Sequence, residues 1–349
     1  MKVYNTERID SLNLPLGTAW LLGECMQARG KQELWMRQRP EVPQVLREQA
    51  VIQSVESSNR IEGVSIAADR LRPVVLGRAQ PRDRSEEELA GYRRALDWIF
   101  SRKLRVKLEP DVVLKLHALA QGGMSGDAGR WKSKDNKIIE ILPNNERRVR
   151  FVPTSPADTP GAMNRLCNAF RLARENEKIP RLLTIAAGVF DLLCIHSFRD
   201  GNGRVSRLVT TLLMIQEGFP VGRFISLERI VEQRKNEYYQ VLERCSKRWH
   251  HGKNDISAWL NFFLSILRNA YGELAKKVER VASTAPKGEM VRRTVNEQVG
   301  PFALSEVAAQ VPGVSLALIK RILAAMKKEG ALSVTGRGRG AVWEVIRRS

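Results

Sequence analysis

The chain has 349 residues, of which 43% are hydrophobic, and this favours two or three globular domains with real cores. It carries 58 lysines and arginines against 38 acidic residues, a formal net charge of +20. Such a balance points to acidic partners: nucleotides, nucleic acid or acidic protein surfaces. The four cysteines form no Cys-x-x-Cys pair, the first ten residues contain no apolar signal core, and no apolar run reaches the length of a membrane span. These features argue against disulfide-rich and membrane-spanning proteins and predict a cytoplasmic location.

The spacing of apolar residues predicts a mainly helical chain. Helices are expected at 42–57 and 85–101, and Ser85 with Glu88 has the spacing of a capping box for the second. Asp111 is the expected cap of a helix that runs through Leu119. Further helices are predicted at about 161–176, 181–195, 204–217, 226–246 and 255–281.

One segment breaks this helical pattern. Apolar strands at 138–142 and 149–152 flank the turn-forming residues 143–146, so a β-hairpin is expected there.

The composition changes again near Thr284. A helix at 291–299, helices at 304–310 and 315–329, and strands at 332–335 and 341–346 are expected in that order. The order resembles a winged-helix domain, an architecture that binds DNA in some proteins and other proteins elsewhere. Its basic residues, which suit DNA phosphates, are Lys320, Arg321, Lys327, Lys328, Arg337 and Arg339.

The most informative segment is HSFRDGNGRVSR, residues 196–207, between two apolar helical stretches. It predicts a loop that ends at the N-terminus of a helix, where free backbone N–H groups and the helix dipole attract anions. Glycines at 201 and 203 let a phosphate approach the backbone closely. His196 can accept a proton near neutral pH, and Asp200 is an oxygen ligand suited to Mg²⁺.

The same twelve residues resemble the Fic motif His-x-Phe-x-(Asp/Glu)-Gly-Asn-Gly-Arg-x-x-Arg, with Ser197 where proline is common. Fic/Doc proteins mostly transfer AMP from ATP to a hydroxyl side chain of a target protein. The resemblance implies that His196 is the base and that Asp200 holds Mg²⁺. It implies that the phosphates contact Gly201, Asn202, Gly203, Arg204 and Arg207.

A second segment, Ser58-x-x-x-Glu62-Gly63, resembles the inhibitory motif that accompanies Fic domains. In the family its glutamate pairs with the second arginine of the motif, here Arg207, and so occupies the seat of the γ-phosphate. The simpler interpretation is a helix end with Gly63 as its C-cap, which is compatible with the first.

Three other features extend the resemblance. The hairpin at 138–152 would be the flap that aligns a target segment by strand pairing. Lys132 stands where the family has an arginine, which weakens any bidentate role there. Tyr238 and Tyr239 match a tyrosine pair that lines the adenine site, although core packing explains them equally well.

Together these observations predict a mainly α-helical Fic core with a small β-hairpin flap and a C-terminal winged helix. Residues 1–105 would form an N-terminal region with the inhibitory motif, 106–283 the catalytic core and 284–349 the winged helix. The expected function is protein adenylyltransfer from Mg·ATP to a Ser, Thr or Tyr hydroxyl, restrained by Glu62.

Several alternatives stay open. They are transfer of UMP, phosphate or phosphocholine, removal of AMP with Glu62 orienting water, and a DNA-binding regulator whose core senses nucleotide. The target protein stays unidentified, and auto-modification and a homodimer are both compatible with the sequence.

Overall fold

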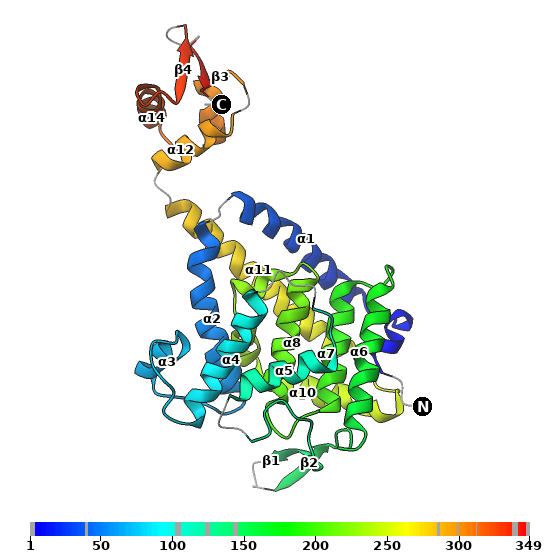
Figure 1. Cartoon of the computed structure of the whole chain (residues 1–349). Helices are drawn as coiled ribbons and strands as arrows, with labels where there is room; N and C mark the ends of the chain where they lie inside the picture. Colours follow the sequence, from blue (N-terminus) through cyan, green and yellow to red (C-terminus); the bar gives the residue numbers. More distant parts are fainter. Residues whose placement is uncertain are drawn as a thin grey trace. The chain divides into compact units, whose positions relative to one another are not determined.

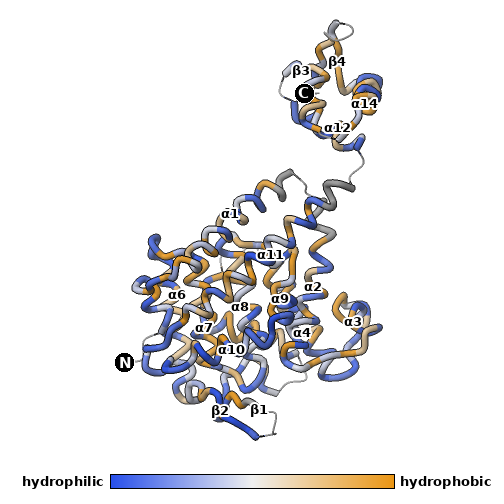
Figure 2. Tube along the Cα trace, turned by 180° about the vertical axis from the view of Figure 1, so that it is seen from behind, coloured by the Kyte–Doolittle hydropathy of each residue, from blue (hydrophilic) through white to orange (hydrophobic). Residues whose placement is uncertain are grey.

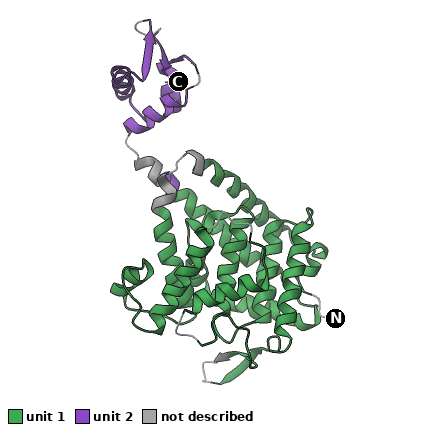
Figure 3. Cartoon of the chain, viewed as in Figure 1, with its two compact units in different colours: residues 1–276 green, residues 277–349 purple. Residues whose placement is uncertain are grey.

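The computed structural model describes residues 4–38, 41–101, 106–122, 126–141, 146–284, 287–298, 300–311, 313–336 and 341–346. These residues form two compact units, 1–276 and 277–349 (Figure 3). The described part of the chain is mainly helical, with a small antiparallel hairpin, as the sequence predicted.

The first part of unit 1 is entirely helical (Figure 1). Its elements are η1 (Thr6–Ser11), α1 (Leu16–Gln38), α2 (Glu41–Ile61), α3 (Ala68–Val75), α4 (Arg84–Ser101) and α5 (Pro110–Gln121). The sequence predicted α2, α4 and α5 but not η1, α1 or α3. In α1 the large apolar residues Leu16 and Trp20 are exposed, so this helix shows no regular apolar stripe, whereas α3 is short and contains Pro73, which argues against a helix in the sequence.

Two predicted helix caps were wrong. Helix α4 begins at Arg84, and it is the Asp83 carboxylate that accepts a hydrogen bond from the Glu86 amide, 2.8 Å away. Ser85 and Glu88 therefore lie inside the helix and form no capping box. Likewise, α5 begins at Pro110, which places Asp111 in its first turn and not at its cap.

The core of unit 1 is built around α7 (Arg181–Ile195), in which every residue after the first is buried. It packs against α6 (Thr159–Glu175) and α8 (Asn202–Gln216), and Figure 2 shows apolar residues concentrated on these inner helices. The Asp191 carboxylate in α7 accepts hydrogen bonds from the Thr6 amide and hydroxyl and from Trp249 Nε1. The end of α7 is thereby tied to two distant segments.

Helices α4 and α5 cross at Gly91. A Cβ there would lie 2.6 Å from the carbonyl oxygens of Leu119 and Ala120, so only glycine permits this approach. The contact brings the preceding turn of α4, which contains Glu88, close to the loop between α7 and α8.

The helix predicted at 226–246 is instead two helices, α9 (Leu227–Gln233) and α10 (Lys235–Ser246), separated at Arg234 (φ −116°, ψ 30°). The short η2 (Pro220–Arg223) precedes them, and η3 (Trp249–His251) and the long α11 (Ser257–Thr284) follow. The apolar pattern continues across the break, which is why the sequence did not reveal it.

The hairpin pairs β1 (Ile138–Ile141) with β2 (Arg147–Phe151) in antiparallel register. It lies at one end of the helical unit (Figure 1). The predicted hairpin is confirmed, with its second strand beginning two residues earlier than expected. Turn residues 143–145 lie outside the described residues.

Unit 2 contains α12 (Lys287–Asn296), β3 (Phe302–Ala303), α13 (Leu304–Gln310), α14 (Leu316–Lys328), β4 (Leu332–Thr335) and β5 (Val342–Val345). Its strands form an antiparallel sheet in the order β3-β5-β4. The unit has its own apolar core, which includes Val291, Val307, Ile319 and Leu323. The predicted helices and both predicted strands are present, β3 is additional, and the winged-helix assignment stays a prediction. Arg337 and Arg339 lie outside the described residues.

Among the described helices, none combines the length and the apolar character that crossing a bilayer requires. Cys25, Cys167, Cys194 and Cys245 are all buried, and none of these four is in a disulfide bond.

Candidate functional site

The loop from His196 to Gly201 joins the most buried helix of the molecule to the N-terminus of α8. Both of its ends have left-handed backbone: His196 has φ 53° and Gly201 has φ 80°. Positive φ is rare for a residue other than glycine and is found preferentially at functional sites. The turn at His196 closes α7 through a hydrogen bond from its amide to the Leu192 carbonyl, 3.1 Å away.

Asn202 holds the loop closed. Its Oδ1 accepts from the Phe198 amide at 2.9 Å, and its Nδ2 donates to the Phe198 carbonyl at 2.7 Å. The Lys132 amide donates to the Ser197 carbonyl at 3.0 Å, and the Lys132 side chain is buried beneath the loop, where Nζ donates to Asn136. Asn202 thus shapes the loop, and Lys132 supports it from below.

An aromatic stack under the loop was missed by the sequence analysis. The His117 ring lies parallel to the Phe198 ring with centroids 3.8 Å apart, and Trp131 stacks on Phe198 at 5.2 Å. His117 Nδ1 accepts from the Gly129 amide, so its Nε2 donates to the Asp200 carbonyl, 3.2 Å away. No local motif marks His117, which lies some 80 residues before the loop; only its place among buried residues of α5 could have suggested it.

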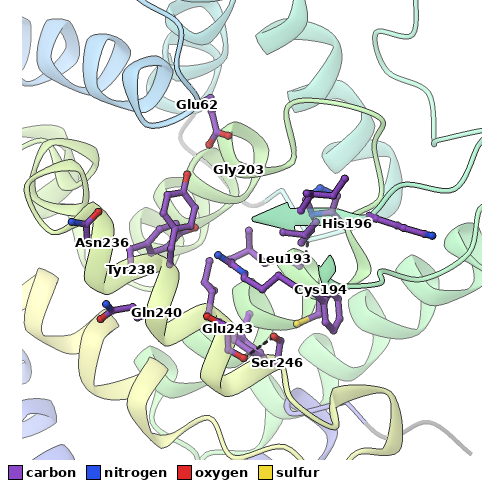
Figure 4. A pocket seen from close by; sticks show the side chains of 18 residues that line it. Glu62, Leu193, Cys194, His196, Gly203, Asn236, Tyr238, Gln240, Glu243 and Ser246 are labelled. Carbon is purple, nitrogen blue, oxygen red and sulfur yellow. Dashed lines mark hydrogen bonds between the residues drawn. The ribbon is translucent and has the colours of Figure 1, made fainter. Parts of the chain in front are cut away.

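His196 faces a cavity of about 660 Å³ between the loop, the hairpin and α10. Figure 4 shows its imidazole on one side of this cavity and Glu62 near Gly203 on another. Burial, and to a lesser extent the nearby Lys132 ammonium, lower the pKa of His196 to about 4. The imidazole is therefore neutral at physiological pH. A proton on Nδ1, which lies 3.3 Å from the Leu193 carbonyl, leaves Nε2 as the proton acceptor.

Arg207 is held by the end of α2 and by the residue that follows this helix. Its Nε donates to Ser58 Oγ at 2.8 Å, and its Nη2 donates to the Ser58 carbonyl at 2.9 Å and to Glu62 Oε1 at 2.7 Å. Burial alone would lower the pKa of this guanidinium, but the Glu62 carboxylate keeps it above its ordinary value. The pair expected from the sequence is therefore present in the structure.

Glu62 follows the last residue of α2, and Gly63 continues the chain with φ 83°. The conformation matches that of a helix C-cap glycine. The Glu62 carboxylate also lies directly against Gly203, since a Cβ at position 203 would collide with Oε1. A carboxylate thus covers the N-terminal turn of α8, the place where an anion is expected to bind.

Arg204 is more deeply buried than its expected role suggested, with 1% of its side chain exposed. Its Nη1 donates to Glu88 Oε2 at 2.7 Å, and its Nη2 lies 3.6 Å from Asp200 Oδ2. Glu88 was absent from the predicted site. Its signal in the sequence is an acid on the same helix face as the buried residues Tyr92 and Ala95.

Both motif arginines keep a buried N–H without a partner among the described residues, Nε in Arg204 and Nη1 in Arg207. Buried donors of this kind are rare, and an anionic ligand would satisfy them. Asp200 is the carboxylate at the mouth of the loop: Oδ1 accepts from the Gly201 amide at 2.6 Å, and half of its side chain is exposed.

Asp200 is also the residue expected to bind metal. Within the described ranges no group of three or more histidines, cysteines or acidic residues could hold a metal ion. The donor set nevertheless fits Mg²⁺, which is commonly held by one or two carboxylates together with substrate phosphates.

The two tyrosines differ in their surroundings, although both line the cavity. Tyr238 packs against Trp259 and Phe262 and is buried. Tyr239 is partly exposed, and its hydroxyl donates to the Ile61 carbonyl, 3.3 Å away, beside Glu62. Burial raises the pKa of both phenols, so they are neutral at physiological pH.

The segment that contains the loop matches the model of a known protein family. Residues 107–214 match the model of the Fic/DOC family. A protein named "Protein adenylyltransferase Fic" from Nematostella vectensis is 26% identical over 222 residues, which are 61% of this chain and 46% of that protein. Another from Drosophila mojavensis is 23% identical over 268 residues, 73% of this chain and 49% of the relative. The chain therefore spans about half the length of the curated relatives it matches.

Two solved structures have the same fold. A Fic family protein from Desulfovibrio desulfuricans has a TM-score of 0.62 at 19% identity and is covered over 98% of its length, against 97% of this chain. A Fic-domain signaling protein from Bacteroides thetaiotaomicron has a TM-score of 0.63 at 19% identity, covering 97% of that chain and 73% of this one. The two structures show that the fold is shared, while the family model and the named relatives confirm the resemblance that the motif predicted.

Proposed function

We propose that this protein, whose residues 107–214 form a Fic/DOC domain, transfers AMP from Mg·ATP to a Ser, Thr or Tyr hydroxyl of a target protein. The observation that carries the proposal is the neutral His196 imidazole in the cavity beside the N-terminus of α8. The imidazole supplies a proton acceptor, and the N-terminus of α8 supplies a turn that binds anions.

The reaction needs few groups from the chain. Nε2 of His196 takes the proton of the target hydroxyl, whose oxygen bonds to the α-phosphorus of ATP while the bond to pyrophosphate breaks. We propose the Gly203 backbone N–H and the unpaired N–H groups of Arg204 and Arg207 as the donors for the phosphates, whereas the Gly201 amide already donates to Asp200 Oδ1. Asp200 would hold Mg²⁺, which when bound neutralises phosphate charge.

Asn202 would act differently from the role its family resemblance implies. Because its amide is engaged on both sides with Phe198, we propose that it fixes the loop and brings the α-phosphate to the neighbouring backbone. Tyr239 is the better candidate for contact with the adenine, since Tyr238 is committed to the core. Strands β1 and β2 contribute Ile138, Ile139, Arg150 and Phe151 to the cavity, which supports their proposed role as the flap.

We further propose that Ser58, Glu62 and Gly63 hold the enzyme in a restrained state. A Glu62 carboxylate against Gly203 repels a phosphate and occupies Arg207, so the terminal phosphate of ATP loses its seat.

The experiment is mass spectrometry of the full chain incubated with Mg·ATP, alone and with protein extract. The expected result is the mass of AMP added to a Ser, Thr or Tyr, on the protein itself or on a target, and no addition with His196→Ala. Addition of phosphate or UMP when the matching donor is supplied, in preference to AMP, would contradict the proposed group.

A second candidate function rests on α14 in unit 2. The exposed residues Ala317, Lys320, Arg321, Ala324, Lys327 and Lys328 follow a helical spacing, and the helix contains no acidic residue. Small side chains between exposed cations suit a helix that enters the major groove of DNA. We propose duplex DNA as the partner of this surface. Binding of full-length protein to DNA should weaken with salt, and Lys320→Ala with Arg321→Ala should reduce the slope of log K against log salt by about 2.

The reduced state of all the described cysteines supports a reducing compartment, and we keep the cytoplasm as the proposed location. A homodimer and auto-modification stay open predictions, and the mass spectra test the second.

A further inference from the structure

Four charged side chains form a closed ring beside the motif loop. Arg84 Nε donates to Glu88 Oε1 at 2.9 Å, and Glu88 Oε2 accepts from Arg204 at 2.7 Å. Both guanidinium groups then approach the same oxygen, Oδ2 of Asp200, with Arg84 at 3.2 Å and Arg204 at 3.6 Å. The ring alternates in sign and sums to zero charge.

Two members of this ring come from α4, which precedes the segment that matches the family model. We propose that α4 completes the nucleotide site: Arg84 is an additional ligand for the outer phosphates of ATP, and Glu88 is the positioning residue that holds Arg84 and Arg204. The inference rests on the proposed use of ATP.

Glu88 has the features of a positioning residue. It is almost completely buried, and each carboxylate oxygen is bonded to a different arginine. A buried guanidinium such as Arg204 requires a counter-ion, and removing one partner of such a pair is costly. The hydrogen bonds that Arg204 donates to Asn59 Oδ1 and Gln121 Oε1 are longer, at 3.4 and 3.5 Å. Glu88 therefore fixes where this guanidinium lies.

Arg84 differs from Glu88 in its exposure. Two thirds of its side chain is exposed, while its Nε is anchored on the buried Glu88 oxygen. The outer edge of its guanidinium touches Asp200, the carboxylate expected to bind Mg²⁺. An exposed pair of this kind contributes little to folding stability. Its position beside the phosphate loop is the more informative property.

The charges of the ring explain why an outer phosphate would take over Arg84. Asp200 would hold Mg²⁺, and a carboxylate that holds a cation would be a weaker acceptor for the two arginines. Phosphate oxygens supply the acceptors and the negative charge that are then lacking, and guanidinium groups bind them as a fork. Arg84 can exchange Asp200 for a phosphate oxygen while its Nε stays hydrogen-bonded to Glu88.

The test is calorimetry of the full chain with Mg·ATP and, separately, with AMP. Arg84→Ala should weaken ATP binding by about three- to tenfold, as for one partly exposed charged contact, and leave AMP binding and the melting temperature unchanged. Arg84→Lys should recover part of the loss, since it keeps the charge but not the fork. Arg93→Ala is the matched control, because Arg93 also pairs with an acid four residues later on α4, Asp97, and should bind ATP as the wild type does.

Glu88→Gln keeps the size of the side chain and removes its charge. It should weaken ATP binding, and the loss in the double variant with Arg84→Ala should be smaller than the sum of the two. If Glu88→Gln does not fold, Arg84→Ala and Arg84→Lys test the inference without it. An ATP affinity unchanged in Arg84→Ala, or an equal loss for ATP and AMP, would overturn the inference.

The inference and the proposed function can fail separately. A phosphate-dependent loss in Arg84→Ala without any AMP transfer by the wild type would support the site and contradict the transfer. Unchanged affinity in an active enzyme would contradict only the role of Arg84. A wild-type chain that binds no ATP would contradict both.

Discussion

Glu62 and Arg207 lie 145 residues apart in the chain, and a 2.7 Å hydrogen bond joins the carboxylate of one to the guanidinium of the other. Ser58 accepts from the same guanidinium through its hydroxyl and its carbonyl. The end of α2 is thus fastened to the first turns of α8, at the turn that an ATP phosphate would occupy. A short helix end can therefore control a site in another part of the unit.

The first prediction concerns the proposed base. His196→Ala should abolish AMP transfer while ATP binding stays close to that of wild type. The reason is that the imidazole is proposed to act on the target hydroxyl, whereas other groups bind the phosphates. AMP incorporation and calorimetry on the same preparation check both parts. Transfer at the wild-type rate would remove His196 from the mechanism.

The second prediction concerns Asp200. Asp200→Ala should weaken Mg²⁺-dependent ATP binding and transfer together, because this carboxylate is the acidic group of the loop and half of it is exposed to a ligand. A Mg²⁺ titration of ATP binding, in the wild type and the variant, measures the effect. Identical titrations in the two proteins would contradict the assignment.

The third prediction follows from the pKa of His196, which burial lowers to about 4. A histidine in an unfolded chain titrates near pH 6.5, so the native state binds fewer protons between these values. The stability associated with the neutral ring is complete above about pH 6.5 and is lost as the pH falls toward 4.

The pH dependence of the transfer rate should reflect the same lowered pKa of His196. In a Glu62→Gly protein, kcat/KM should stay level from about pH 8 down to about pH 5.5, because the base is already neutral. A pH–rate profile with an acidic limb centred near pH 6.5 would show that His196 titrates normally and is not buried in the working enzyme.

The fourth prediction concerns the chain after α11. A 1–283 fragment should fold and bind ATP as the whole chain does, because unit 1 and unit 2 each enclose an apolar core. Thermal unfolding and calorimetry of the fragment beside the full chain test this. An insoluble fragment from a soluble parent would place the boundary elsewhere.

Sequence alone predicted the helical class, the hairpin and the motif loop because each has a local signal. The motif is one continuous run of twelve residues, and the contact of Glu62 with Arg207 was implied by the resemblance of both motifs to the Fic family. The hairpin followed from two apolar strands around turn residues.

The contacts and the helix break that the sequence did not reveal depend on packing between residues that are distant in the chain. Glu88 reaches Arg204 across 116 positions, and nothing next to either residue announces the contact. Its acidic side chain suggested a helix cap, a local function that Asp83 performs instead. The break at Arg234 and the stack of His117 on Phe198 likewise arise from neighbours that are distant in sequence.

The measurement that tests the account most directly is AMP transfer by Glu62→Gly. The change removes the carboxylate from Arg207 and from Gly203, and a charge-assisted contact of this kind is worth about 1.5–3 kcal/mol. Transfer should therefore rise about tenfold or more above wild type. Arg207→Ala should not reproduce the rise, because it also removes a phosphate ligand.

Glu56→Gly is the matched control, since it makes the same substitution on α2 at a partly exposed glutamate that pairs with Arg60. Labelling with radiolabelled ATP at equal protein concentration compares the four proteins. The account predicts a rise in Glu62→Gly alone. A Glu62→Gly protein that is folded and binds ATP but labels no faster than wild type would contradict the central claim that Glu62 restrains the enzyme.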